Sequence, residues 1–70
     1  MITFSTYANK KFEILNQHKV YLRQEQIEQV VLQPNRVAKI SLYHHAYGDD
    51  ANVVYKKNGD DIIILTFYPA

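Results

Sequence analysis

Residues 53–70 read VVYKKNGDDIIILTFYPA and form the most regular pattern in the chain. Asn58 and Gly59 both tolerate the positive backbone angles of a type I′ turn, and the residues around them favour β-structure. This stretch therefore predicts an antiparallel hairpin with strands near Asn52–Lys57 and Asp60–Tyr68. A two-residue turn fixes the register, so the expected pairs are Lys57 with Asp60, Lys56 with Asp61, Tyr55 with Ile62, Val54 with Ile63, and Val53 with Ile64.

Both faces of this predicted hairpin are apolar. Because side chains alternate along a strand, one face carries Val54, Ile63, Leu65 and Phe67. The opposite face carries Val53, Tyr55, Ile62, Ile64, Thr66 and Tyr68. Two short helices can cover one face of a small sheet, and a chain of 70 residues has nothing left to cover the second. Unless the sheet curls, we expect the face with Tyr55 and Tyr68 to be an exposed patch, and such patches often mark binding surfaces.

The residues before the hairpin predict two helices. A hydroxyl at Ser5 or Thr6 can cap a helix near Thr6–Asn16, in which apolar side chains recur every three or four residues. A second helix ends before Pro34, since the residue before a proline is pushed out of the helical region. Its apolar stripe consists of Ile27, Val30 and Val31.

Two further segments predict strands. Ile2–Phe4 forms a short strand at the start of the chain, and Arg36–Tyr47 alternates as a half-buried strand does. The order of elements predicts an α+β fold, with a helical hairpin packed on one face of an antiparallel sheet of three to four strands. We expect residues 1–70 to be a single domain.

Composition excludes several classes of protein. The chain is 47% hydrophobic and 21% charged, as globular proteins are, and its longest wholly apolar run, Ile62–Leu65, is too short to cross a bilayer. Met1–Leu15 contains Lys10, Lys11 and Glu13 where a secretory signal needs an apolar stretch, so we expect a cytoplasmic protein. There is no cysteine, which removes disulfides and thiolate chemistry. The net charge of +1 permits nucleic-acid binding without indicating it.

Metal and cofactor sites are not expected. His44 and His45 are adjacent on a predicted strand, so their side chains point to opposite faces. The two Asp-Asp pairs, Asp49–Asp50 and Asp60–Asp61, lie in turns, where Asp is favoured for local hydrogen bonding. No glycine-rich phosphate loop or nucleophile elbow is present.

Tyrosine is the most informative residue type, with six in the chain. Tyr43, Tyr55 and Tyr68 lie on predicted strands, where aromatic rings on an open face can stack bases. Phosphate contacts would come from Lys10, Lys11 or Lys57. The alternative is that these tyrosines pack in the core or form a protein interface, because strands favour tyrosine in any case.

Three segments carry a resemblance to a known family: STYANKKFEIL (Ser5–Leu15), QEQIEQVVLQP (Gln24–Pro34) and the quoted hairpin. Together they resemble a family of small bacterial proteins of unknown function that is similar to the RelE and ParE toxins of type II toxin–antitoxin modules. The resemblance implies a sheet backed by a helical hairpin, with a free face that takes messenger RNA at the ribosome or is blocked by an antitoxin. Two features depart from the family: Asn52 replaces a basic residue, and no basic tail follows Pro69.

Two hypotheses follow. In the first, the protein is a RelE-like toxin that binds RNA through Lys10, Lys11, Lys57 and Tyr43. Metal-independent cleavage, which the resemblance implies, would use Tyr55 or His45 to carry a proton and Lys57 or Lys10 to stabilise charge on the phosphate, with Tyr68 as a further candidate. In the second, the protein is a noncatalytic interaction module or homodimer whose interface consists of Val53, Tyr55, Ile62, Ile64 and Tyr68.

Overall fold

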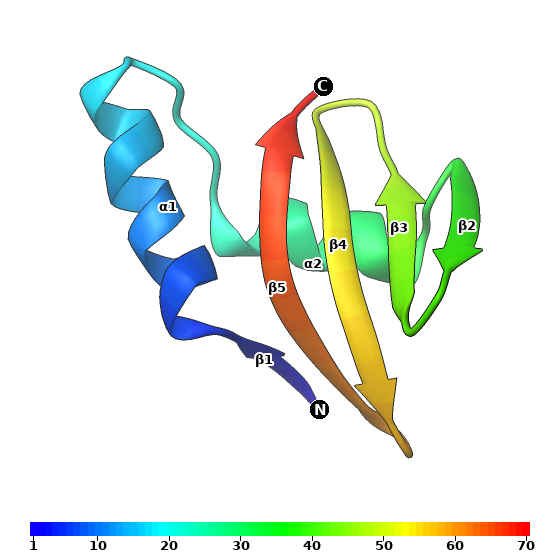
Figure 1. Cartoon of the computed structure of the whole chain (residues 1–70). Helices are drawn as coiled ribbons and strands as arrows, with labels where there is room; N and C mark the ends of the chain where they lie inside the picture. Colours follow the sequence, from blue (N-terminus) through cyan, green and yellow to red (C-terminus); the bar gives the residue numbers. More distant parts are fainter.

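The computed structural model describes residues 1–70 and has an α+β fold, in which two helices pack on a five-stranded mixed sheet (Figure 1). The elements in chain order are β1 (Ile2–Phe4), α1 (Thr6–Gln17), α2 (Gln24–Leu32), β2 (Arg36–Ile40), β3 (Tyr43–Tyr47), β4 (Ala51–Asn58) and β5 (Asp61–Pro69). The strand order is β1-β5-β4-β3-β2, and β1 is parallel to β5 while the other neighbours are antiparallel. The predicted class is confirmed, whereas the wholly antiparallel sheet of three to four strands is wrong.

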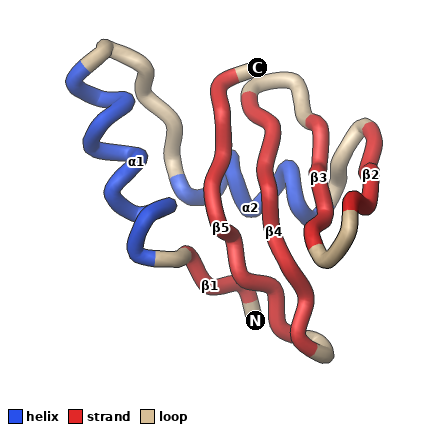
Figure 2. Tube along the Cα trace, in the orientation of Figure 1, coloured by secondary structure: helices blue, strands red, loops and turns tan.

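The helices begin and end close to their predicted positions. Ser5 caps α1 as expected, because its side-chain oxygen accepts a hydrogen bond from the backbone N–H of Ala8 at 3.1 Å. The same hydroxyl donates to the carbonyl of Leu65 at 3.0 Å, which ties the start of α1 to β5. A loop then leads to α2, which ends before Pro34 (Figure 2).

The predicted strand Arg36–Tyr47 is two strands joined by a tight turn at Ser41 and Leu42. Ser41 adopts a φ of 57°, which reverses the chain and starts β3 antiparallel to β2. The turn residues Ser41 and Leu42 include no glycine, asparagine or proline, the residues that usually mark such a turn. The alternating pattern of the sequence therefore continues through the turn without a break. Because of the turn, Ala38 and Ala46 lie on opposite faces of the sheet, although the single strand placed them on the same face.

The hairpin turn lies one residue further along the chain than predicted. Asn58 pairs with Asp61, so the two-residue loop is Gly59–Asp60, and Gly59 alone has a positive φ, of 64°. Glycine at the first loop position is the arrangement of a type II′ turn rather than type I′. The predicted Lys–Asp pairs across the turn are therefore wrong, and Asp61 instead lies 3.4 Å from the N-terminal amine.

A bulge in β5 changes the faces of its last residues. Tyr55 pairs with Ile64, but its neighbour Val54 pairs with Thr66, which leaves Leu65 unpaired. Ile64 and Phe67 consequently point to the same face and are both fully buried. The regular alternation predicted above had placed them on opposite faces.

The core lies between the helices and one face of the sheet. In Figure 1, α2 crosses behind β5, β4 and β3, while α1 lies beside β5. The largest fully buried side chains are those of Phe67, Ile27, Ile64 and Val53. Phe12 of α1 packs on Phe67 with ring centroids 4.6 Å apart. We call the face of the sheet in contact with the helices the covered face, and the other the open face. Neither helix combines the length and the apolar character that a bilayer crossing requires.

Candidate nucleic-acid interface

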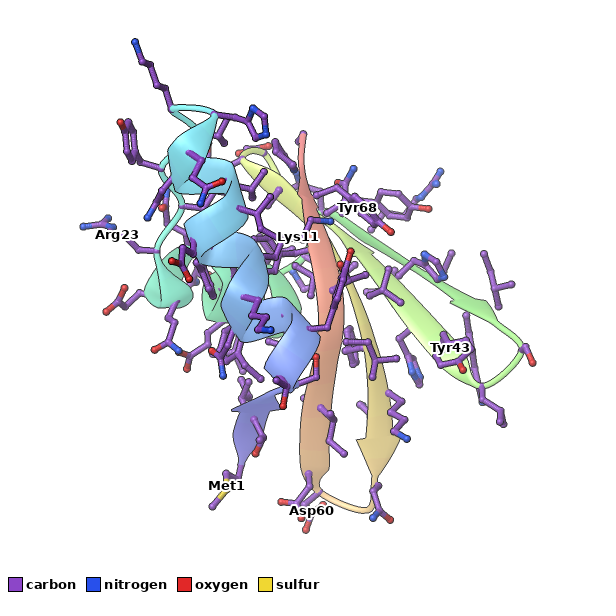
Figure 3. All side chains as sticks on the ribbon, turned by 60° about the vertical axis from the view of Figure 1, so that its left-hand side comes forward. Met1, Lys11, Arg23, Tyr43, Asp60 and Tyr68 are labelled. Atoms are coloured by element: carbon purple, nitrogen blue, oxygen red, sulfur yellow. The ribbon has the colours of Figure 1, made fainter.

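The open face is defined by the strand register. Residues paired across antiparallel strands share a face, so one row runs from Arg36 to Tyr47, Asn52 and Tyr68 across four strands. A second row, along the same direction, contains Ala38, His45, Val54 and Thr66. No element packs on these rows in Figure 1, and Tyr43 projects on the side away from the helices in Figure 3.

A cation contacts each tyrosine of the first row. The guanidinium of Arg36 lies over the Tyr47 ring, 4.6 Å from its centroid. Lys11 reaches from α1 to the other end of the row, where its Nζ lies 3.8 Å from the centroid of the Tyr68 ring (Figure 3). Cation–π contacts of this kind hold an aromatic ring and a positive charge together. We call the set Arg36, Tyr47, Asn52, Tyr68 and Lys11 the tyrosine row.

Lys11 bridges the ends of the two rows on β5. Its Nζ donates a hydrogen bond of 3.2 Å to Oγ1 of Thr66, and Thr66 belongs to the second row. Partial burial removes water from the ammonium group and lowers the pKa of Lys11 below its ordinary value. No carboxylate contacts this lysine, so its charge remains available to an anionic ligand.

The charge of the open face is positive. Besides Arg36 and Lys11, the face carries Lys56, which pairs with Ile63. The one acidic strand residue on this face, Asp61, lies at the hairpin tip beside the N-terminal amine. The remaining carboxylates are in turns and helices: Glu13, Glu25, Glu28, Asp49, Asp50 and Asp60.

Four of the five predicted interface residues lie on the covered face instead. Val53 and Ile64 are fully buried and Tyr55 is 4% exposed, so the predicted interface made of these residues is wrong. The error follows from the assignment of faces, since the helices cover the face that was expected to be open. Ile62 is half-buried on the covered face, against β1. Of the predicted interface, only Tyr68 is on the open face, with half of its surface exposed.

Tyr55 cannot act on a ligand of the open face. Its ring stacks on His44 with centroids 5.1 Å apart, and its burial raises the pKa of the phenol above its ordinary value. His44 and His45 do point to opposite faces, and His45 lies on the open face beside Val54. No group of three His, Cys, Asp or Glu side chains is placed to hold a metal ion.

The predicted lysines separate into two groups. Lys11 and Tyr43 belong to the open face, whereas Lys57 pairs with Ile62 and so lies toward the covered face at the hairpin tip. Lys10 is exposed on α1 and makes no contact with the tyrosine row. The structure thus brings Lys11, Tyr43, His45 and Tyr68 onto one surface, and it places Lys10, Lys57 and Tyr55 elsewhere.

Four residues of this surface were not predicted as site residues: Arg36, Tyr47, Asn52 and Thr66. Arg36 and Tyr47 become neighbours only because the chain turns between them, at a turn without a sequence signal. Thr66 and Tyr68 reach the open face only because of the bulge at Leu65. The abundance of tyrosine was the one available signal.

The covered side has a shallow groove of about 350 Å³ between α2 and the β3–β4 turn. Its walls are polar, and its two turn carboxylates already have hydrogen-bond partners within the protein. Asn35 donates to Asp49 at 2.8 Å, and Gln26 donates to Asp50 at 3.5 Å.

No protein-family model matches the chain, and no match was found among curated proteins or solved structures. The functional argument therefore depends on the residues of the open face and their chemistry.

Proposed function

We propose that the protein binds RNA on the open face of its sheet and is a RelE-like toxin of a type II toxin–antitoxin module. The observation that carries the binding proposal is the tyrosine row, in which two tyrosines and two cations share a surface that has no carboxylate between its ends. Unpaired bases stack on aromatic rings while phosphates pair with cations. The row offers both groups to the same ligand.

The arrangement of the fold supports the toxin part of the proposal. The family resemblance implies a sheet backed by two helices, with a free face for messenger RNA or an antitoxin. Here α1 and α2 lie beside and behind the sheet, and only the side chain of Lys11 reaches from α1 over a ring of the tyrosine row. In the resting cell, an antitoxin segment would cover this row, and its removal would free the face for RNA at the ribosome.

Cleavage by this protein would use the open face alone. His45 and Thr66 flank Val54 in the second row, two strands or about 10 Å apart, and Thr66 holds the ammonium of Lys11. With a phosphate above Val54, His45 would take the proton of the ribose 2′-hydroxyl, whose oxygen would attack phosphorus. The bond from phosphorus to the 5′-oxygen would break, and that oxygen would take up a proton from water. Lys11 would stabilise the developing charge, and the products would be a 2′,3′-cyclic phosphate and a 5′-hydroxyl.

The binding proposal is tested by fluorescence anisotropy with a labelled single-stranded RNA octamer. We expect saturable binding that weakens as salt increases. Absence of binding at 50 mM salt would rule out the RNA-binding function. For cleavage, a His45→Gln variant should bind the octamer as the unmodified protein does but form no cyclic phosphate, whereas equal product from both proteins would exclude the role of His45.

The toxin part is tested in cells. Induced expression of the unmodified protein in a translation-competent bacterium should arrest growth. Expression of the open-face variant Lys11→Gln/Arg36→Gln at the same level should not. Normal growth at verified levels of the unmodified protein would contradict a toxin role while leaving RNA binding to be judged by anisotropy.

A second candidate function is a homodimer formed through the free edge of β2. Only β3 pairs with this strand, and Ile40 and Leu42 at its end are 56% and 77% exposed. An unpaired edge with apolar side chains favours the addition of another strand. Sedimentation equilibrium tests this function: a dimer that persists at high salt and dissociates in Ile40→Asp would support it, and a monomer at all concentrations would exclude it.

A further inference from the structure

The arrangement of the tyrosine row indicates how the RNA ligand is recognised. This inference rests on the proposed RNA binding. We infer that the row is a base-reading site for unpaired RNA, in which Tyr47 and Tyr68 each stack one base and the side-chain amide of Asn52 hydrogen-bonds a base edge between them.

The first argument is the position of Asn52. It pairs with Tyr47 on one side and Tyr68 on the other, so the three side chains form a continuous line across β3, β4 and β5. Adjacent strands are about 4.8 Å apart, which separates the two tyrosine positions by roughly 10 Å. Two stacked nucleotides therefore have room on the row, with Asn52 beneath the space between their bases.

The second argument is that the amide of Asn52 is free. Asn52 is half-buried, between the fully buried Ala51 and Val53, yet its side chain takes part in none of the protein's hydrogen bonds. An amide offers a donor and an acceptor side by side, which is the pattern needed to read the edge of a base. The amide atoms of Asn52 are not buried, so they are open to solvent and to a base that stacks beside them.

The third argument is the placement of charge. Arg36 and Lys11 lie at the two ends of the row, each against the ring of the nearer tyrosine. Each cation occupies one face of its ring, so a base would stack on the opposite face, with its phosphate within reach of that cation. The ligand chemistry that matches the row is therefore phosphate, base, base, phosphate, as in a short unpaired stretch of RNA. Duplex RNA does not match, because its bases are already stacked and paired.

Stacking is tested with Tyr47→Leu and Tyr68→Leu, alongside Tyr47→Phe, Tyr68→Phe and the control Tyr21→Leu, which changes an exposed tyrosine outside the sheet. We expect each sheet leucine variant to weaken octamer binding roughly 5- to 150-fold, the range of one base–aromatic stack. The phenylalanine variants and Tyr21→Leu should bind nearly as tightly as the unmodified protein. Equal affinities for all five variants would overturn the inference.

Base reading is tested with a series of uridine octamers in which one position is varied among the four bases. We expect the unmodified protein to discriminate among them, and the ratios of affinity to approach one in Asn52→Ala. Ratios that do not change in this variant would overturn the role of Asn52. Circular dichroism of Asn52→Ala verifies that the variant is folded, so that a change in the affinity ratios can be attributed to the missing amide.

A direct measurement on the unmodified protein covers the case in which a tyrosine variant does not fold. The fluorescence of 2-aminopurine in the octamer should be quenched on binding, and a matched duplex should compete poorly. Unchanged fluorescence together with equal competition by the duplex would mean binding through the backbone alone, which would overturn the base-reading site but not RNA binding. Failure of the unmodified protein to bind any RNA would instead overturn the proposed function, and this inference with it.

Discussion

Two double variants that remove the same charge distinguish binding at the open face from attraction by net charge. Lys11→Gln/Arg36→Gln removes the two cations of the tyrosine row, and Lys10→Gln/Lys57→Gln removes two exposed lysines outside it. Each change lowers the formal net charge by two, from +1 to −1. Glutamine keeps a long polar side chain at each position, so any difference between the variants arises from where the charge was.

The magnitude follows from counterion release. Each phosphate contact on a single strand contributes about 0.7 to the slope of log affinity against log salt. If Lys11 and Arg36 each neutralise one phosphate, their loss lowers the slope by about 1.4, which corresponds to roughly 25-fold weaker binding at 0.1 M salt relative to a 1 M reference. The slope of the Lys10 and Lys57 variant should stay close to that of the unmodified protein.

The assay is anisotropy of the labelled octamer between 50 and 300 mM salt, with circular dichroism and the urea midpoint of each variant as controls for folding. Equal slopes for the two double variants would refute the reasoning, because binding would then depend on overall charge rather than on the open face. A larger effect of Lys10 and Lys57 would place the RNA on the helices or at the hairpin tip.

Three further predictions concern the fold and its titration, each measured by urea denaturation. Ser5→Ala should lower the free energy of unfolding by about 1–2 kcal/mol, since it removes the cap of α1 and the hydrogen bond to Leu65; no change would mean that water replaces both. Phe67→Ala should cost about 3–5 kcal/mol and Tyr68→Ala much less, because only Phe67 is fully buried; similar losses would contradict the face assignment at the bulge. Burial raises the pKa of the Tyr55 phenol, so the folded protein binds this proton more tightly than the unfolded chain does. The resulting stabilisation is present below the ordinary tyrosine pKa of about 10 and is lost as the pH rises above it. Tyr55→Phe should therefore lose less stability between pH 8 and pH 10.5 than the unmodified protein, and an equal loss would refute the link.

The sequence predicts the elements of this fold well where a local signal marks their ends. Ser5 supplies a cap, Pro34 stops a helix, and Gly59 marks a turn to within one residue. The parallel pairing of β1 with β5 was not predictable in this way, because it joins residues some 60 positions apart and no local pattern encodes it.

The sequence predicts that one face of the sheet lacks cover, but it does not predict which residues lie on that face. The limited number of helices implied that one face would lack cover, and the structure has such a face. Which residues occupy it depends on register, and a strand pattern with apolar residues on both sides, as in Ile62–Leu65, does not specify which side turns inward. Tyr55 and Ile64 were assigned to the wrong side for this reason.

Two local irregularities that the sequence does not announce create the candidate site. In one continuous strand, Arg36 and Tyr47 would be eleven residues apart and on opposite faces; the turn at Ser41 makes them a cross-strand pair on one face. In a regular β5, Tyr68 would share the covered face with Ile64; the bulge at Leu65 moves it to the open face, opposite Asn52. The same bulge keeps Phe67 in the core, so the strand supplies a buried anchor and an exposed tyrosine in succession. Bulges commonly redirect side chains next to functional sites. A regular strand that kept Leu65 in the alternation would have to expose Phe67 and bury Tyr68. The tyrosine row and the packing of α1 on β5 are therefore linked, because both depend on one unpaired residue.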